Sequence, residues 1–167
     1  MPMAKTAPGT AAVRVALHAA RADRAHRADD AAAGAGLAPL AKSADFAFEV
    51  VRPARPDGRT MVLLHGSGGD ETSLVRLAAR IAPHATLLGI RGRVLQDGRR
   101  RWYRRLTPVT FDQEDIRAES AAFAHFLGRT AADLDIDLSR TVFLGYSNGA
   151  NLIAATALLH PGLVRKA

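Results

Sequence analysis

The stretch "TVFLGYSNGANLIAATALL", residues 141–159, joins a predicted strand to a predicted helix through a serine. "TVFLG" is a short apolar run of the kind that forms a buried strand. "SNGANLIAATALLH" reads as a helix that stops before Pro161. Between them, Gly145, Ser147 and Gly149 form the pattern G-x-S-x-G, in which the serine occupies a strained turn and its neighbours must lack bulk. The stretch therefore predicts a strand–turn–helix unit that presents the serine.

Strand and helix signals alternate in the residues that precede this unit. Three further strands are predicted from "DFAFEVV", "TMVLLHG" and "ATLLGI", at 45–51, 60–66 and 85–90. Apolar residues recur at helical spacing at Leu74, Leu77, Ala78 and Ile81, which predicts a helix with one apolar face toward the core. A second helix is predicted over 112–134, with Asp112 as its N-cap. Such alternation predicts an α/β fold with a mostly parallel sheet and helices on both faces.

The glycine-rich segment "LLHGSGGD", residues 63–70, follows one of the predicted strands. A reactive serine needs two backbone N–H groups to bind the oxyanion, one after the serine and one in a loop after an earlier strand. Asn148 is predicted to supply the first and Ser67 the second, with Gly68 as the neighbouring candidate.

Structural alternatives exist for each of these residues. The loop could cradle a phosphate, but "HGSGGDE" lacks both the dinucleotide-binding spacing and a P-loop lysine. Ser147 could be an ordinary turn serine. His65 is expected to be structural, shaping the loop rather than acting in the chemistry.

Length and composition favour a single domain in the cytoplasm. The chain has 167 residues, of which 48% are apolar, enough to build one core. No apolar run reaches the roughly 18 residues of a membrane span, and the N-terminus lacks the apolar region of a secretory signal. Cysteine is absent, which excludes a disulfide framework, a thiolate metal site and a cysteine nucleophile.

The positive charge is concentrated in one segment. Residues 91–105, "RGRVLQDGRRRWYRR", hold seven arginines and one aspartate, and so supply six of the seven net positive charges. The segment is expected to be a solvated or substrate-facing loop. The alternative is a nucleic-acid patch, with Trp102 or Tyr103 stacking on bases.

Residues 1–42 are rich in alanine and arginine and hold no aromatic residue. With little to bury, they are predicted to be a disordered extension, and 43–167 to be the folded domain. Residues 13–33 could instead form a helix. The segment also resembles an organelle transit peptide, and it could arise from a start codon assigned too far upstream.

The chain resembles bacterial α/β-hydrolases of the phospholipase/carboxylesterase group, which are serine esterases and thioesterase-like enzymes. The resemblance rests on "LLHGSGGDE", "RGRV" followed by "RWYRR", "FDQEDI" and "LGYSNGANLIAATALLHP", from about residue 45 to the C-terminus. It implies hydrolysis of a small-molecule carboxylic ester, with Ser147 as nucleophile and the amides of Asn148 and Ser67 binding the oxyanion. It implies no metal, organic cofactor, nucleic acid or membrane partner.

The sequence departs from this family after Ser147. In the family an acid and then a histidine follow the serine, but the last twenty residues contain no acid and one histidine, His160. Thirteen residues of continuous helix rise about 20 Å, which places His160 beyond the reach of a general base. The other histidines precede the serine; they are His18, His26, His65, His84 and His125.

These departures predict the N-terminal part of an α/β-hydrolase domain, with the last strands and the triad acid and histidine missing. Such a chain is expected to be inactive or nearly so alone, with the strand over 141–145 left at an exposed apolar edge. A second polypeptide could complete it. The alternatives are a non-catalytic homologue that binds a ligand or partner and, more distantly, a nucleic-acid binder.

Overall fold

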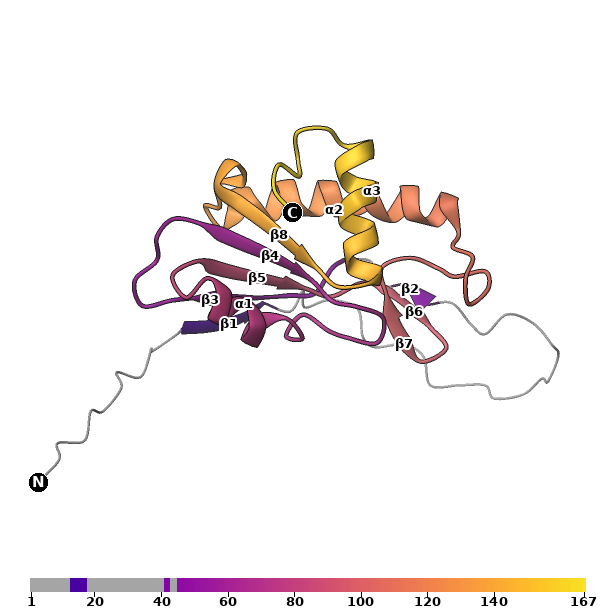
Figure 1. Ribbon diagram of the computed structural model, residues 1–167, viewed down its shortest axis with the longest axis horizontal. Coiled ribbons are helices and arrows are strands. Elements are labelled where there is room, and N and C mark those ends of the chain that lie inside the picture. The colour runs from indigo at the N-terminus through magenta and orange to yellow at the C-terminus, as the bar shows by residue number, and fades with distance from the viewer. Residues whose placement is uncertain (1–12, 18–40, 43–44) are drawn as a thin grey trace, which may run out of the picture.

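The computed structural model describes residues 13–17, 41–42 and 45–167, and its main sheet has the strand order β1-β3-β5-β4-β8 (Figure 1). The strands are β1 Val13–Leu17, β3 Phe48–Arg52, β4 Thr60–Leu64, β5 Thr86–Ile90 and β8 Thr141–Gly145. β4 pairs in parallel with β5 on one side and with β8 on the other. β3 and β1 extend the sheet in antiparallel fashion. The parallel sheet predicted from the sequence is confirmed for β5, β4 and β8, and the whole sheet is mixed.

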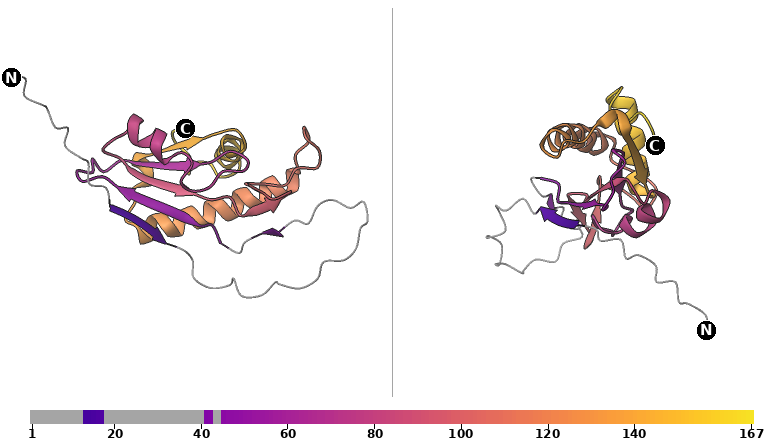
Figure 2. Two further views of the ribbon diagram at one scale, coloured as in Figure 1. Left: turned by 90° about the horizontal axis from the view of Figure 1, so that it is seen from below. Right: turned by 90° about the vertical axis from the view of Figure 1, so that its left-hand side faces the viewer.

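Helices cover both faces of this sheet, as predicted (Figures 1 and 2). The helices are α1 Val75–Ile81, α2 Gln113–Asp133 and α3 Asn148–Leu159. On β4, Met61 and Leu63 join the apolar cluster that includes α1 residues, while Val62 and Leu64 join the larger cluster with α2 and α3 residues. None of the helices in the described part of the chain has the length and apolar character needed to cross a membrane.

The residues that the short helix α1 buries differ from those predicted. Of the four positions expected to face the core, Ala78 is buried, but Leu77 is 50% exposed and Ile81 is 60% exposed. Val75 is buried instead. A helix of seven residues makes about two turns, so only a narrow strip of it contacts the sheet.

The arginine-rich segment forms a hairpin, so the expectation of a loop there is wrong. Strands β6 Val94–Gln96 and β7 Arg99–Arg101 pair in antiparallel register. The two residues that join them, Asp97 and Gly98, have φ of 54° and 68°. Positive φ at both central residues is typical of the tight turns that Asp-Gly favours, and this dipeptide was the overlooked signal. β2 Ala41–Lys42 pairs with β6 to complete a three-stranded sheet.

The two aromatic residues after β7 lie in the core. Trp102 and Tyr103 are both 0% exposed. Trp102 stacks on Phe46 at a centroid distance of 6.0 Å. Neither ring can stack on a nucleic-acid base in this structure, so the stacking mode on which the nucleic-acid alternative depended is wrong.

Part of the N-terminal extension is ordered into strands. Residues 13–17 form β1, which pairs with β3 over its whole length, and 41–42 form β2. Disorder was expected for both segments, with a helix as the alternative over 13–33, but strand β1 satisfies backbone groups that β3 would otherwise leave unpaired at the sheet edge. The same expectations for residues 1–12 and 18–40 lie outside the described residues. The domain boundary after residue 42 stays a prediction.

Strand β8 lies at the end of the sheet, as expected, but the following chain returns to it. The Phe143 N–H donates a hydrogen bond of 2.9 Å to the Lys166 carbonyl. Leu163 and Val164 pack against the larger core cluster. Figure 1 shows the C-terminus beside β8. The edge of β8 is therefore covered near its middle rather than fully exposed.

Candidate functional site

Ser147 occupies a strained turn between β8 and α3. Its backbone has φ of 49° and ψ of −111°, a conformation that L-residues seldom adopt. Such a residue costs about 1–3 kcal/mol, which the surrounding structure must offset. Its side chain makes no capping hydrogen bond to α3, and the residue is exposed. The Ser147 hydroxyl is thus held at the surface and left available.

The glycines on either side of the serine permit this turn to close. A Cβ added to Gly145 would lie 2.6 Å from Ile153 Cδ1 and 2.7 Å from Ala150 Cα. A Cβ added to Gly149 would overlap the Leu64 carbonyl oxygen and lie 2.6 Å from that of His65. The prediction that both neighbours must lack bulk is confirmed by these contacts.

The turn at Ser147 packs against the glycine-rich loop that follows β4. The Tyr146 N–H donates a hydrogen bond of 3.0 Å to the Leu64 carbonyl. Gly149 lies against the carbonyls of Leu64 and His65. Because β4 and β8 are parallel neighbours, their carboxyl ends bring the two predicted oxyanion segments to one edge of the sheet.

Hydrogen bonding distinguishes the two loop candidates for the oxyanion donor. The Gly68 N–H donates to the Arg100 carbonyl at 2.7 Å, so it is already in use. The Ser67 N–H has no acceptor among the described residues. Asn148 is the first residue of α3, where a helix leaves its N–H groups unpaired. Among the described residues the N–H groups of Ser67 and Asn148 are thus unpaired, whereas that of Gly68 is in use. The role of Ser67 and Asn148 as oxyanion donors stays a prediction.

Trp102 ties both segments to the hairpin. Its backbone N–H donates to Asn148 Oδ1 at 2.7 Å, and its indole Nε1–H donates to the His65 carbonyl at 2.8 Å. The Oδ1 of Asn148 is therefore a structural anchor, and the backbone N–H of Asn148 stays available for a ligand. No pattern in the sequence indicated this anchoring role for Trp102.

His65 lies beneath the loop with both ring nitrogens engaged. Its Nε2 accepts the Gly92 N–H at 2.9 Å. Its Nδ1 lies 2.6 Å from the Gly66 carbonyl and must therefore donate. This pattern requires a neutral ring, and burial lowers the pKa of His65 below its ordinary value. The geometry agrees with the expected structural role and provides no base for Ser147.

The other described histidines lie away from Ser147. His160 follows α3, twelve helical residues beyond the serine. His84 precedes β5, at the opposite end of the parallel strands, and His125 is exposed on α2. His18 and His26 fall outside the described residues. The described part of the chain also holds no group of three His, Cys, Asp or Glu side chains placed to bind a metal ion.

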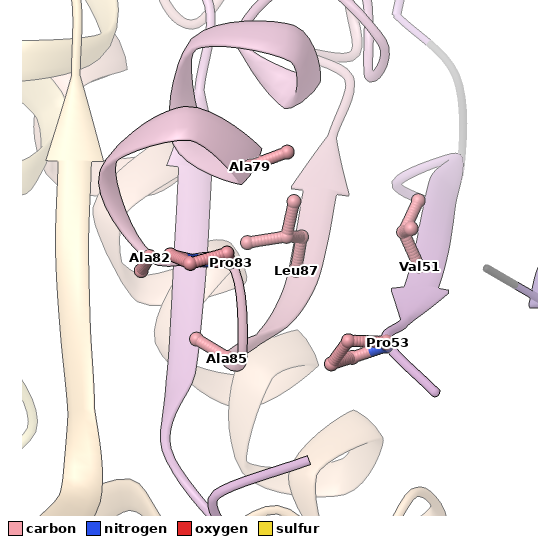
Figure 3. A pocket seen from close by; sticks show the side chains of 7 residues that line it. All are labelled: Val51, Pro53, Ala79, Ala82, Pro83, Ala85 and Leu87. Atoms are coloured by element: carbon pink, nitrogen blue, oxygen red, sulfur yellow. The ribbon is translucent and has the colours of Figure 1, made fainter. Parts of the chain in front are cut away.

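An apolar hollow of about 250 Å³ lies elsewhere in the molecule (Figure 3). It is lined by Val51, Pro53, Ala79, Ala82, Pro83, Ala85 and Leu87. These residues surround the end of α1 and the start of β5, whereas Ser147 follows the carboxyl end of β8. The hollow is therefore separate from the serine turn.

Comparison with known proteins gives relatives that are longer than this chain. No family model matches it. It is 41% identical over 100 residues to "Putative hydrolase MhqD" of Bacillus subtilis, which covers 60% of this chain and 50% of that protein. It is 45% identical to a carboxylesterase crystal structure from Mesorhizobium loti, with a TM-score of 0.68, over 75% of this chain and 61% of that one.

A second solved structure, the Bacillus cereus carboxylesterase, is 36% identical, with a TM-score of 0.65. That match covers 71% of this chain and 55% of the Bacillus cereus chain. The chain thus spans half of MhqD and between half and two thirds of the two carboxylesterases.

Proposed function

We propose, from the premise that the chain belongs to the α/β-hydrolase esterase family, that Ser147 is the nucleophile of a carboxylic ester hydrolase. The observation that carries the proposal is the strained Ser147 turn with its uncapped hydroxyl, at the carboxyl end of a parallel strand. A structural serine at the start of a helix normally has an extended backbone and caps the helix. Ser147 does neither.

In the proposed reaction the Ser147 oxygen attacks the carbonyl carbon of a small-molecule ester. The N–H groups of Ser67 and Asn148 would bind the oxyanion of the tetrahedral intermediate, and the first amides of α3 add their partial positive charge. Loss of the alcohol would leave an acyl-serine, which water then hydrolyses. A single oxyanion donor typically contributes about 10²–10³-fold to the rate of such reactions.

The described residues do not supply the general base that this reaction needs. His65 is committed to two hydrogen bonds, and the other described histidines lie away from the serine. We therefore propose that this chain lacks the triad acid and histidine, and that a polypeptide of these 167 residues alone is inactive or nearly so. An oxyanion site without its base retains only about 10³–10⁴-fold over the reaction in water. A cytoplasmic location remains part of the proposal.

A chimera tests the role of Ser147. Residues 45–167 would be fused to the part of the Mesorhizobium loti carboxylesterase that lies beyond the matched region and assayed with 4-nitrophenyl acetate. We expect turnover that falls about 10⁴-fold or more in the Ser147→Ala chimera. A folded, active chimera that keeps its turnover after Ser147→Ala would remove Ser147 as the nucleophile.

The same assay on the 167-residue chain tests the missing base separately. We expect no turnover above that of the Ser147→Ala chain. Turnover that requires Ser147 in this chain would support the nucleophile and overturn the proposed inactivity.

A further inference from the structure

Arg101 is a buried cation with no carboxylate partner among the described residues. Three other arginines of the same segment form ion pairs, which are Arg91 with Glu71, Arg93 with Glu119 and Arg104 with Asp112. Arg101 is 6% exposed, and within the described part of the chain its guanidinium makes one hydrogen bond, from Nη1 to Ser67 Oγ at 3.0 Å. Its Nε is the one buried side-chain nitrogen or oxygen among the described residues that lacks a hydrogen-bond partner.

This arrangement is costly for folding. A charged group that leaves water without a counter-ion loses its hydration, and a buried donor without an acceptor adds the cost of its own desolvation. Burial is the main cause that lowers the pKa of Arg101. The positive charges of Arg105 and Arg99 lower this pKa further, whereas the negative charge of Asp97 raises it. The guanidinium stays charged at neutral pH. The side chain therefore offers an unneutralised positive charge to an anion.

The charge lies at the proposed oxyanion segment. Arg101 contacts Ser67 directly, and the preceding residue, Arg100, accepts the Gly68 N–H. The following residue, Trp102, holds Asn148 and the carbonyl of His65. Residues 100–102 are thus bound to both segments of the site, so the hairpin fixes the guanidinium relative to them.

We propose that Arg101 is a specificity-determining residue that binds a carboxylate carried by the ester substrate. The proposal rests on the proposed ester site at Ser147 and Ser67, and it adds the class of substrate, an acidic carboxylic ester. The planar fork of the guanidinium presents paired N–H donors that match the two oxygens of a carboxylate. A ligand carboxylate would supply the counter-charge that the described chain does not.

Binding to the Ser147→Ala chain tests this without requiring catalysis. Monomethyl succinate, a monoanion, and dimethyl succinate, its neutral counterpart, would be titrated while the arginine Nε–H signals are followed by NMR. We expect the anion to bind about tenfold or more tightly than the diester and to shift the Arg101 signal. Arg101→Met in the same background should abolish the preference.

Two further variants distinguish a specific contact of Arg101 with the carboxylate from general attraction by the positive charge of the hairpin. Arg99→Met removes an exposed arginine from the same strand and should keep the preference. Arg101→Lys keeps the charge without the fork, so it should retain a smaller preference even if Arg101→Met fails to fold. Equal affinities for the two esters, no binding of the anion, or the same loss in Arg99→Met would each overturn the proposal. None of these outcomes depends on whether Ser147 reacts.

Discussion

The helices α2 and α3 begin in opposite ways. Asp112 at the start of α2 has an extended backbone, with φ of −72° and ψ of 107°, and its carboxylate accepts the N–H groups of Glu114 and Asp115. Ser147 at the start of α3 has φ of 49° and ψ of −111°, and its hydroxyl caps nothing. Asp112 also forms an ion pair with Arg104.

The start of α2 therefore stabilises the fold, whereas the strained start of α3 costs free energy that contacts elsewhere in the fold must offset. The bonds of Asp112 satisfy N–H groups that α2 would otherwise leave unpaired. Ser147 leaves such groups free and adopts a strained backbone, and the close contacts of Gly145 and Gly149 hold it there. Free donors and an exposed hydroxyl weaken a helix, but they are what acyl transfer requires.

The largest effect is expected from Gly149→Ala. The new methyl group would overlap the backbone of Leu64 and His65, which cannot move without disturbing β4. We expect a loss of about 3 kcal/mol or more in the free energy of unfolding, measured in urea. The control is Gly128→Ala in the middle of α2, where an added Cβ meets nothing within 4 Å. It should stabilise the protein by about 0.5–1 kcal/mol, and similar values for both variants would contradict the account.

Truncation of the α2 cap should have the next largest effect. Asp112→Ala removes the acceptor for two backbone N–H groups, and we expect the free energy of unfolding to fall by about 1–2 kcal/mol. The matched substitution is Ser147→Ala, which removes no capping bond and should change stability by less than about 0.5 kcal/mol. If the two substitutions cost the same, the helix starts do not differ as described.

Acidification should remove the stabilising contributions of His65, beside the Ser147 turn, and of Asp112, at the start of α2, in different pH ranges. Burial lowers the pKa of His65 below 6.5, so the unfolded chain binds its proton first and the free energy of unfolding falls as the pH drops below about 6.5. Backbone hydrogen bonding and Arg104 lower the pKa of Asp112 below 3.8, so its contribution is lost only in more acidic solution.

Urea unfolding across this pH range checks the His65 effect. The slope from one histidine cannot exceed about 1.4 kcal/mol per pH unit. His65→Gln should remove the component near pH 6, whereas His125→Gln, at an exposed position on α2, should leave it. An unchanged pH dependence in His65→Gln would show that the ring is not held neutral.

The smallest effect, and one of opposite sign, is expected from Ser147→Gly. Glycine adopts positive φ without the cost that a side chain brings, so the variant should be more stable by up to about 1 kcal/mol. The same substitution at Asp112 should destabilise the protein. A Ser147→Gly variant less stable than the parent chain in urea would mean that the turn is not strained.

The sequence predicted the elements that carry the site because each has a strong local signal. The apolar runs gave β4, β5 and β8, and the spacing of Gly145 and Gly149 around Ser147 gave the turn. The hairpin over 91–105 was missed because its arginines suggested a solvated loop, although Asp97 and Gly98 marked a tight turn.

Other features depend on contacts between distant residues. The anchoring of Asn148 by Trp102 spans 46 residues, and the bond from Arg101 to Ser67 spans 34. No local pattern encodes such pairings. The sequence already favoured Ser67 over Gly68 as oxyanion donor, but no local pattern showed that the Arg100 carbonyl accepts the Gly68 N–H.

The most direct test of the reactive Ser147 turn is the site of covalent labelling. The chimera completed with the Mesorhizobium loti carboxylesterase segment would be treated with a fluorophosphonate, and its peptides mapped by mass spectrometry. We expect one adduct, on the peptide that contains Ser147, and none in the Ser147→Ala chimera. An active chimera labelled at another residue, or hydrolysing esters without any adduct at Ser147, would contradict it.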